Sequence, residues 1–164
     1  MIKTRDLNIG ALICAIAIPI AVGALSSLIT AGAMKQYGSM NKPALSPPGW
    51  LFPVVWSILY TVMGIASYYV FTEDAEKSLK YNALLLYAGQ LLLNFFWSIL
   101  FFKFSLYLPA FFWLVAMWIM ILVTIISFFY VNKLAGFLMI PYLLWTTFAA
   151  YLNFSTYKLS IAPM

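Results

Sequence analysis

The sequence has no histidine, and its single cysteine, Cys14, has no second thiol with which to pair. Without histidine the chain lacks the commonest general base, the commonest metal ligand and the commonest protein ligand of haem iron. One cysteine excludes a disulfide framework and a thiolate metal cluster. We therefore predict no metal site and no bound cofactor. Because Cys14 stands within an apolar run, we expect it to be a small core residue.

Charge is also scarce. Charged residues make up 8% of the chain, hydrophobic residues make up 65%, and the mean hydropathy is +0.98. A soluble domain has about half apolar and about a quarter charged residues, so this composition indicates an integral multi-pass membrane protein. The net charge of +5 comes from lysines and arginines at segment ends, where lipid headgroups account for them. The charge therefore does not imply nucleic acid as a partner, and the expected partner is the lipid bilayer.

No Asp, Glu, Lys, Arg or His lies inside an apolar segment except near an end. This excludes the proton relays and ion-coupling carboxylates that many transporters use. A carboxylate pair, a Ser/His arrangement and a phosphate-binding glycine loop are missing as well. Any catalysis would depend on the ligand, on oxygen or light, or on aromatic side chains.

Apolar windows long enough to cross a bilayer predict an all-α fold, a bundle of five transmembrane helices in one domain. The predicted helices cover residues 8–31, 49–72, 80–103, 106–130 and 134–156. Most connections are short, which favours antiparallel neighbours. Only the first loop, 32–48, is long. The nine Lys and Arg divide five against four between the two sides, so the orientation stays open.

Small and polar residues repeat every three or four positions along most of the predicted helices. In the third helix Gln90, Asn94 and Ser98 lie on one side, and Asn153 lies on the polar side of the fifth. Such residues often join helices by hydrogen bonds, and they can also line a cavity. The fourth helix is the least polar, so we expect it to face lipid or a partner subunit.

The start of the second helix is rich in proline. Ser46 followed by Pro47 is typical of an N-cap and a first helical residue, and Pro48 and Pro53 are expected in or near the first turns. This predicts a rigid entrance at the membrane surface. Trp50 would belong to an interfacial aromatic belt.

Large aromatic residues follow at greater depth and predict a cavity. We expect its wall to include Trp56, Tyr60, Trp97 and Trp145, its floor Asn94, and its roof the first loop with Lys35, Tyr37 and Lys42. Aromatic faces stack on a planar ring, and lysines suit an anionic edge. The predicted ligand is a large, flat, apolar molecule with a polar edge.

Three blocks of sequence resemble one known family. They are KPALSPPGWLFPVVWSILYTVMGIAS (42–67), LLLNFFWSILFF (91–102) and LMIPYLLWTTFAAYLN (138–153). In this order they are similar to the TspO/MBR family, which comprises bacterial tryptophan-rich sensory proteins and the mitochondrial translocator protein, or peripheral benzodiazepine receptor. The resemblance covers essentially the whole chain.

The resemblance implies a five-helix bundle, often a homodimer, that binds porphyrins such as protoporphyrin IX beneath the first loop, and in animals also cholesterol and benzodiazepine-type drugs. A bacterial member would lie in the cell membrane. By position, Trp56 and Trp145 match two tryptophans implicated in porphyrin photodegradation. The other matching positions are Tyr37, Pro47, Pro48, Asn94, Trp97 and Ala149.

The chain departs from the family pattern at Leu45, where many members have tryptophan, and at Pro53, where glycine is common. A cholesterol motif is not met at the C-terminus because Tyr157 directly precedes Lys158. Three hypotheses stay open: a porphyrin-binding receptor or translocator, a light- and oxygen-dependent porphyrin-degrading activity that uses Trp56 and Trp145, and a structural protein without a small-molecule ligand.

Overall fold

A computed structural model describes residues 7–38, 43 and 45–162, with the side chains of 34–38 left out of the description. Within this part the chain is all-helical, and five helices are long and apolar enough to cross a membrane. The prediction of an all-α transmembrane bundle is confirmed. The helices are α1 (Ile9–Gly38), α2 (Leu51–Thr72), α3 (Lys77–Ser98) with its continuation η1 (Ile99–Lys103), α4 (Tyr107–Val131) and α5 (Lys133–Ile161).

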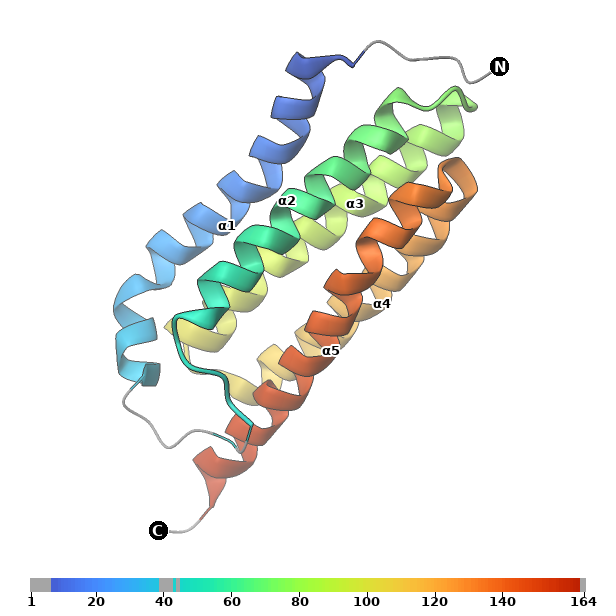
Figure 1. Cartoon of the computed structure of the whole chain (residues 1–164). Coiled ribbons are helices and arrows are strands. Elements are labelled where there is room, and N and C mark those ends of the chain that lie inside the picture. The colour runs from blue at the N-terminus through green and yellow to red at the C-terminus, as the bar shows by residue number, and fades with distance from the viewer. Residues whose placement is uncertain (1–6, 39–42, 44, 163–164) are drawn as a thin grey trace.

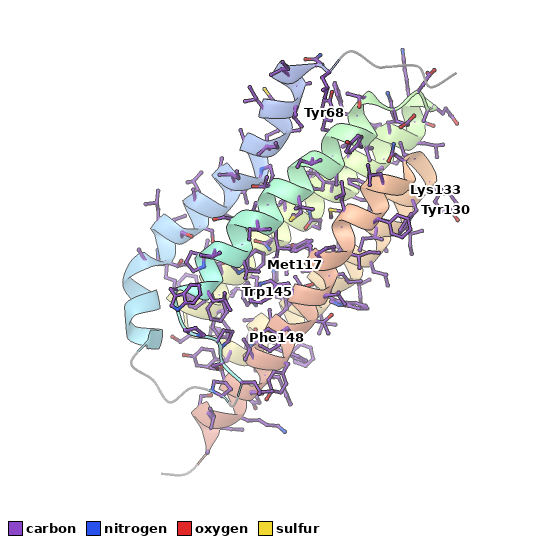
Figure 2. The ribbon with its side chains drawn as sticks, viewed as in Figure 1. Tyr68, Met117, Tyr130, Lys133, Trp145 and Phe148 are labelled. Atoms are coloured by element: carbon purple, nitrogen blue, oxygen red, sulfur yellow. The ribbon has the colours of Figure 1, made fainter. Side chains whose placement is uncertain are left out.

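The helices run side by side, and the two termini lie at opposite ends of the bundle (Figure 1). Helix α2 packs against α1 and α5, α4 packs against α3 and α5, and α1 also reaches α3 and η1. Short connections enforce this antiparallel order. Trp145 and Phe148 lie in the half of the bundle nearer the α1–α2 connection, whereas Tyr68 and Lys133 lie near the other end (Figure 2).

The first connection is shorter than expected, because α1 continues as far as Gly38. The prediction that Ser46 caps the second helix is wrong: Trp50 precedes the first helical residue, Leu51. The N–H of Leu51 bonds to the carbonyl oxygen of Pro48 at 2.9 Å, so Pro48 begins a turn before the helix, whereas Pro53 lies in the first helical turn. Leu45 has a φ of 68°, the left-handed backbone region that side chains other than glycine rarely adopt.

One further expectation, that for Cys14, is wrong. Helix α4 has the exposed face that was expected, with Phe112, Ile119 and Val123 on it, but Leu114, Met117 and Ile121 on its other side are fully buried against α3 and α5. Its apolar composition reflects two faces, one in the core and one toward lipid. Cys14 is exposed on α1 instead of lying in the core, since an apolar run in a membrane protein has a lipid face as well.

The end of the bundle away from the α1–α2 connection is closed by side-chain caps. Asn132 precedes α5, and its Oδ1 accepts a hydrogen bond from the N–H of Ala135 at 3.0 Å. Its Nδ2 donates to Glu73 after α2. Lys80 Nζ donates to the carbonyl oxygens of Phe71 and Glu73 at 3.1 and 2.9 Å. These bonds satisfy helix-end groups that would otherwise need water.

Helices α1 and α2 approach closely at two glycines. The ring of Tyr60 in α2 occupies the space where Gly23 of α1 lacks a side chain. At Gly64 of α2, an added Cβ would lie 2.5 Å from the Cα of Ile16 and 2.7 Å from the carbonyl oxygen of Ala15. Small residues at such crossings let helices gain packing contacts that lipid does not otherwise favour.

We predict that Gly64→Ala lowers the thermal stability of the detergent-purified protein, because the new methyl group meets backbone that must move. The expected cost is about 1–3 kcal/mol. Gly89→Ala is the matched control: its Cβ would meet the flexible side chain of Met120, with Cε at 3.8 Å and Sδ at 4.0 Å, so it should be neutral or slightly stabilising. Equal behaviour of the two variants would contradict the close α1–α2 crossing.

Candidate functional site

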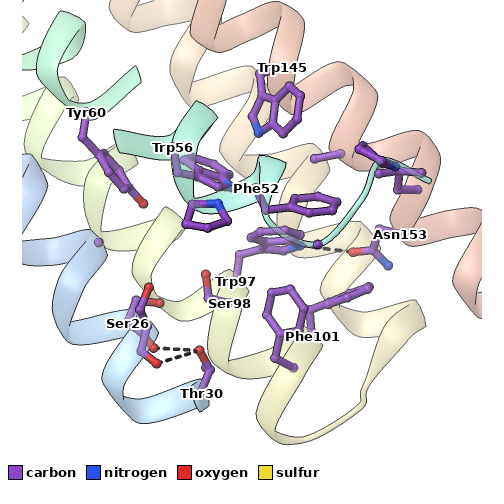
Figure 3. A pocket seen from close by; sticks show the side chains of 18 of the residues that line it. Ser26, Thr30, Phe52, Trp56, Tyr60, Trp97, Ser98, Phe101, Trp145 and Asn153 are labelled. Carbon is purple, nitrogen blue, oxygen red and sulfur yellow. Dashed lines mark hydrogen bonds between the residues drawn. The ribbon is translucent and has the colours of Figure 1, made fainter. Parts of the chain in front are cut away.

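A pocket with a volume of about 230 Å³ lies at the end of the bundle where α1 connects to α2. Its lining comes from α1, the segment before α2, α2 itself, α3 with η1, and α5. Figure 3 shows aromatic rings gathered on one side and the hydroxyl-bearing end of α1 on the other. The residues that line it are Gly23, Ser26, Ser27, Thr30, Ser46, Pro47, Gly49, Phe52, Pro53, Trp56, Tyr60, Trp97, Ser98, Phe101, Phe102, Trp145, Ala149, Leu152 and Asn153.

Helix α2 contributes the central aromatic group. Trp56 and Tyr60 are one turn apart and stack with ring centroids 5.4 Å apart. The Trp56 ring lies 6.4 Å from that of Trp97 and 6.1 Å from that of Tyr142. These separations lie within the range of favourable aromatic contacts. Trp56 therefore joins aromatic side chains from three helices.

The third helix changes its hydrogen-bond pattern where it reaches the pocket. The π-helical segment η1 places Phe101 and Phe102 in the pocket lining, and the Phe101 ring stacks on Trp97 at 5.6 Å. Such segments inside helices are frequent at functional sites. The sequence reasoning treated 80–103 as one regular helix, so it missed both phenylalanines.

Two asparagines fix the aromatic side chains by hydrogen bonds. Asn94 accepts a bond from the Tyr60 hydroxyl at 2.8 Å and donates to the Tyr142 oxygen at 3.0 Å. Asn153 accepts from Trp97 Nε1 at 3.1 Å and donates to the carbonyl oxygen of Tyr107 at 2.7 Å. Both amides are buried, and a satisfied buried amide restricts its neighbours to one arrangement.

Two polar atoms of the lining are buried without a hydrogen-bond partner among the residues that the structure describes. They are the indole Nε1 of Trp145 and the hydroxyl oxygen of Ser46. The ring centroid of Trp145 lies 6.0 Å from that of Phe52 and 5.6 Å from that of Phe148, so its surroundings are largely aromatic. An unpaired buried donor costs free energy that a hydrogen-bond acceptor on a ligand would recover.

Six of the nine residues predicted for the site line the pocket: Pro47, Trp56, Tyr60, Trp97, Trp145 and Ala149. Asn94 lies behind the wall, where it holds Tyr60. Pro48 is exposed and does not belong to the lining. The side chains of Tyr37 and Lys35, and all of Lys42, lie outside the described residues.

The sequence reasoning missed the wall contributed by α1. Gly23, Ser26, Ser27 and Thr30 lie on its pocket side, and all four recur at helical spacing as small or hydroxyl-bearing residues. The sequence pattern left both helix packing and cavity lining open for such residues. Small residues on a helix serve close packing and a cavity equally well, so the pattern alone could not distinguish the two.

The fold and the site define an integral multi-pass membrane protein with an aromatic pocket at one end of a five-helix bundle. The sequence model of the TspO/MBR family matches residues 15–158. The chain belongs to the TspO/MBR family, as the sequence resemblance predicted.

Named relatives come from bacteria, archaea and mammals. The chain is 39% identical to the tryptophan-rich protein TspO of Chlorobaculum tepidum, over 86% of this chain and 90% of the relative. It is 36% identical to protein CrtK of Rhodobacter capsulatus, over 84% and 85% of the two chains. It is 35% identical to the translocator protein of Sus scrofa, over 86% and 85%. The bacterial relatives fit a location in a cell membrane.

Proposed function

We propose that the protein is a membrane receptor or translocator-type protein that binds porphyrins, such as protoporphyrin IX, or related flat apolar molecules in this pocket. The observation that supports the proposal most is the combination of flat aromatic walls with buried polar atoms that have no partner among the described residues. Trp56, Trp97 and Phe101 present ring surfaces, and the polar atoms are Trp145 Nε1 and the Ser46 hydroxyl oxygen.

The walls favour a planar ligand because stacked rings gain contact area without losing hydrogen bonds. The α1 side offers hydroxyl-bearing residues, so the two sides of a bound ring would meet different chemistry. A ligand with acceptor atoms at its edge would also bond to the Trp145 indole. A purely aliphatic ligand would leave that donor unpaired and should bind less well.

The volume of about 230 Å³ is smaller than the roughly 300–1,000 Å³ of pockets for drug-sized ligands. We infer that a porphyrin widens the pocket by moving the α1 wall outward. Helix α1 is the least enclosed of the five helices, and its packing on α2 rests on the glycine crossings. The other walls are held by the hydrogen bonds of Asn94 and Asn153.

Titration of the detergent-purified protein with protoporphyrin IX in the dark tests the binding proposal. Tryptophan fluorescence should be quenched saturably. Trp145→Phe should weaken binding by about 2- to 10-fold, because phenylalanine keeps the ring and removes the donor. Trp50→Phe is the control, since Trp50 is 67% exposed and lies outside the pocket lining.

Absence of saturable quenching in the wild-type protein would contradict porphyrin binding and would favour a structural protein with packed aromatic side chains. Equal weakening by the Trp145 and Trp50 substitutions would show that binding does not take place in this pocket.

A second candidate function is light- and oxygen-dependent degradation of the bound porphyrin. The aromatic contacts of Trp56 favour it, because oxidisable rings lie close together: Trp56 neighbours Tyr60, Trp97 and Tyr142. Light and oxygen would supply the oxidant, and Trp56 and Trp145 would act as redox-active side chains next to the porphyrin.

Illumination of the porphyrin-loaded protein in air tests this second function. Wild-type protein should remove porphyrin absorbance faster than detergent alone, and a variant with both Trp56→Phe and Trp145→Phe should lose that acceleration while retaining binding. Trp118→Phe is the control, since Trp118 bonds to Thr147 away from the pocket. A wild-type rate equal to that of free porphyrin would exclude degradation and leave the binding proposal standing.

A further inference from the structure

Gln90 on α3 is fully buried, at 0% exposure. Neither Oε1 nor Nε2 of its amide has a hydrogen-bond partner within the described part of the chain. A glutamine amide can donate two hydrogen bonds and accept two. Inside a bilayer there is no outer solvent to satisfy these groups, so a buried amide without partners is rare and calls for a bound molecule.

The register of the helices shows which residues of α2 and α5 lie near the level of this amide. On α2, Tyr60 pairs with Asn94, and Ser67 lies beside Tyr87. The antiparallel stretch between these two contacts places Gly64 level with Gln90, and Met63 is the next residue along α2. On α5, Met139 lies one turn before Tyr142, which bonds to Asn94. Met63 and Met139 are both fully buried, and their flexible thioethers can adjust to make room for a small polar molecule.

Asn94 lies one helical turn from Gln90 on the same face of α3. Residues four apart on a helix have Cβ atoms about 5–6 Å apart, a separation that one water molecule can bridge with two hydrogen bonds. Asn94 has a donor to spare: its Nδ2 carries two hydrogens, and one of them bonds to Tyr142. A water at this place would therefore find partners on both amides, as buried waters require.

We propose that at least one ordered water molecule is bound inside the bundle between Gln90 and Asn94. It satisfies the Gln90 amide and extends the hydrogen-bonded group of Tyr60, Asn94 and Tyr142 one helical turn deeper than the pocket. The site is separate from the pocket lining, and it does not depend on which ligand the pocket binds.

A crystal structure at a resolution that shows ordered waters tests the proposal directly. A density peak is expected at hydrogen-bond distance, about 2.6–3.2 Å, from the Gln90 amide and from Asn94. Gln90→Met should remove the peak and keep the bonds of Asn94 to Tyr60 and Tyr142. An ordered Gln90 without such a peak, or one bonded directly to protein atoms, would overturn the proposal.

Thermal unfolding gives a second test that needs no crystals. If the Gln90 amide had no hydrogen-bond partner, Gln90→Met would remove an unsatisfied buried polar group and raise the unfolding temperature. If a water is bound there, Gln90→Met removes satisfied hydrogen bonds instead. It should then lower the unfolding temperature by more than the control Leu91→Met does. A higher unfolding temperature for Gln90→Met would overturn the proposal.

Discussion

The structure depends on a constraint that the bilayer imposes: polar groups inside the bundle must find their partners within the protein. Two asparagines meet this requirement for several of the aromatic side chains. Asn94 on α3 joins Tyr60 on α2 to Tyr142 on α5, and Asn153 on α5 joins Trp97 on α3 to the backbone of Tyr107 on α4. Four helices are thereby cross-linked at the level of the pocket and immediately beneath it.

This cross-linking divides the pocket into two kinds of wall. The aromatic rings of α2, α3 and α5 are oriented by hydrogen bonds and by one another, so they form a fixed surface for stacking. Helix α1 meets that group through close packing at Gly23 and Gly64 and contributes small and hydroxyl-bearing residues. Ligands of different thickness could then be accommodated by α1 while the aromatic surface stays unchanged. The α1 crossing and the asparagine bonds thus have separate roles in the same site.

Much of the fold could be predicted from the sequence because membrane insertion leaves a strong signal: five long apolar segments joined by short connections. The details of the helix ends could not. Ser46 and Pro47 have the composition of a helix start, yet the turn through Pro48 delays the helix to Leu51. The π-helical segment after Ser98 has no comparable sequence signal.

The site was predictable where large aromatic residues recur in apolar helices, as at Trp56, Trp97 and Trp145. It was not predictable where one residue type serves two purposes. Asn94 was expected in the cavity floor, but it lies behind Tyr60. Only the three-dimensional structure shows that Tyr60, and not its hydrogen-bond partner Asn94, lines the pocket. For the same reason the Ser and Thr residues of α1 could not be assigned to the pocket from the sequence. Homodimer formation stays a prediction.

The central claim is that a planar ligand enters this pocket and accepts a hydrogen bond from Trp145. The most direct measurement is the ¹⁵N spectrum of the six tryptophan indoles during titration with protoporphyrin IX in the dark. The Trp145 indole signal should shift saturably, whereas that of Trp118, already bonded to Thr147 at 2.8 Å, should stay unchanged. An unchanged Trp145 signal, or equal shifts of Trp145 and Trp118, would contradict the claim.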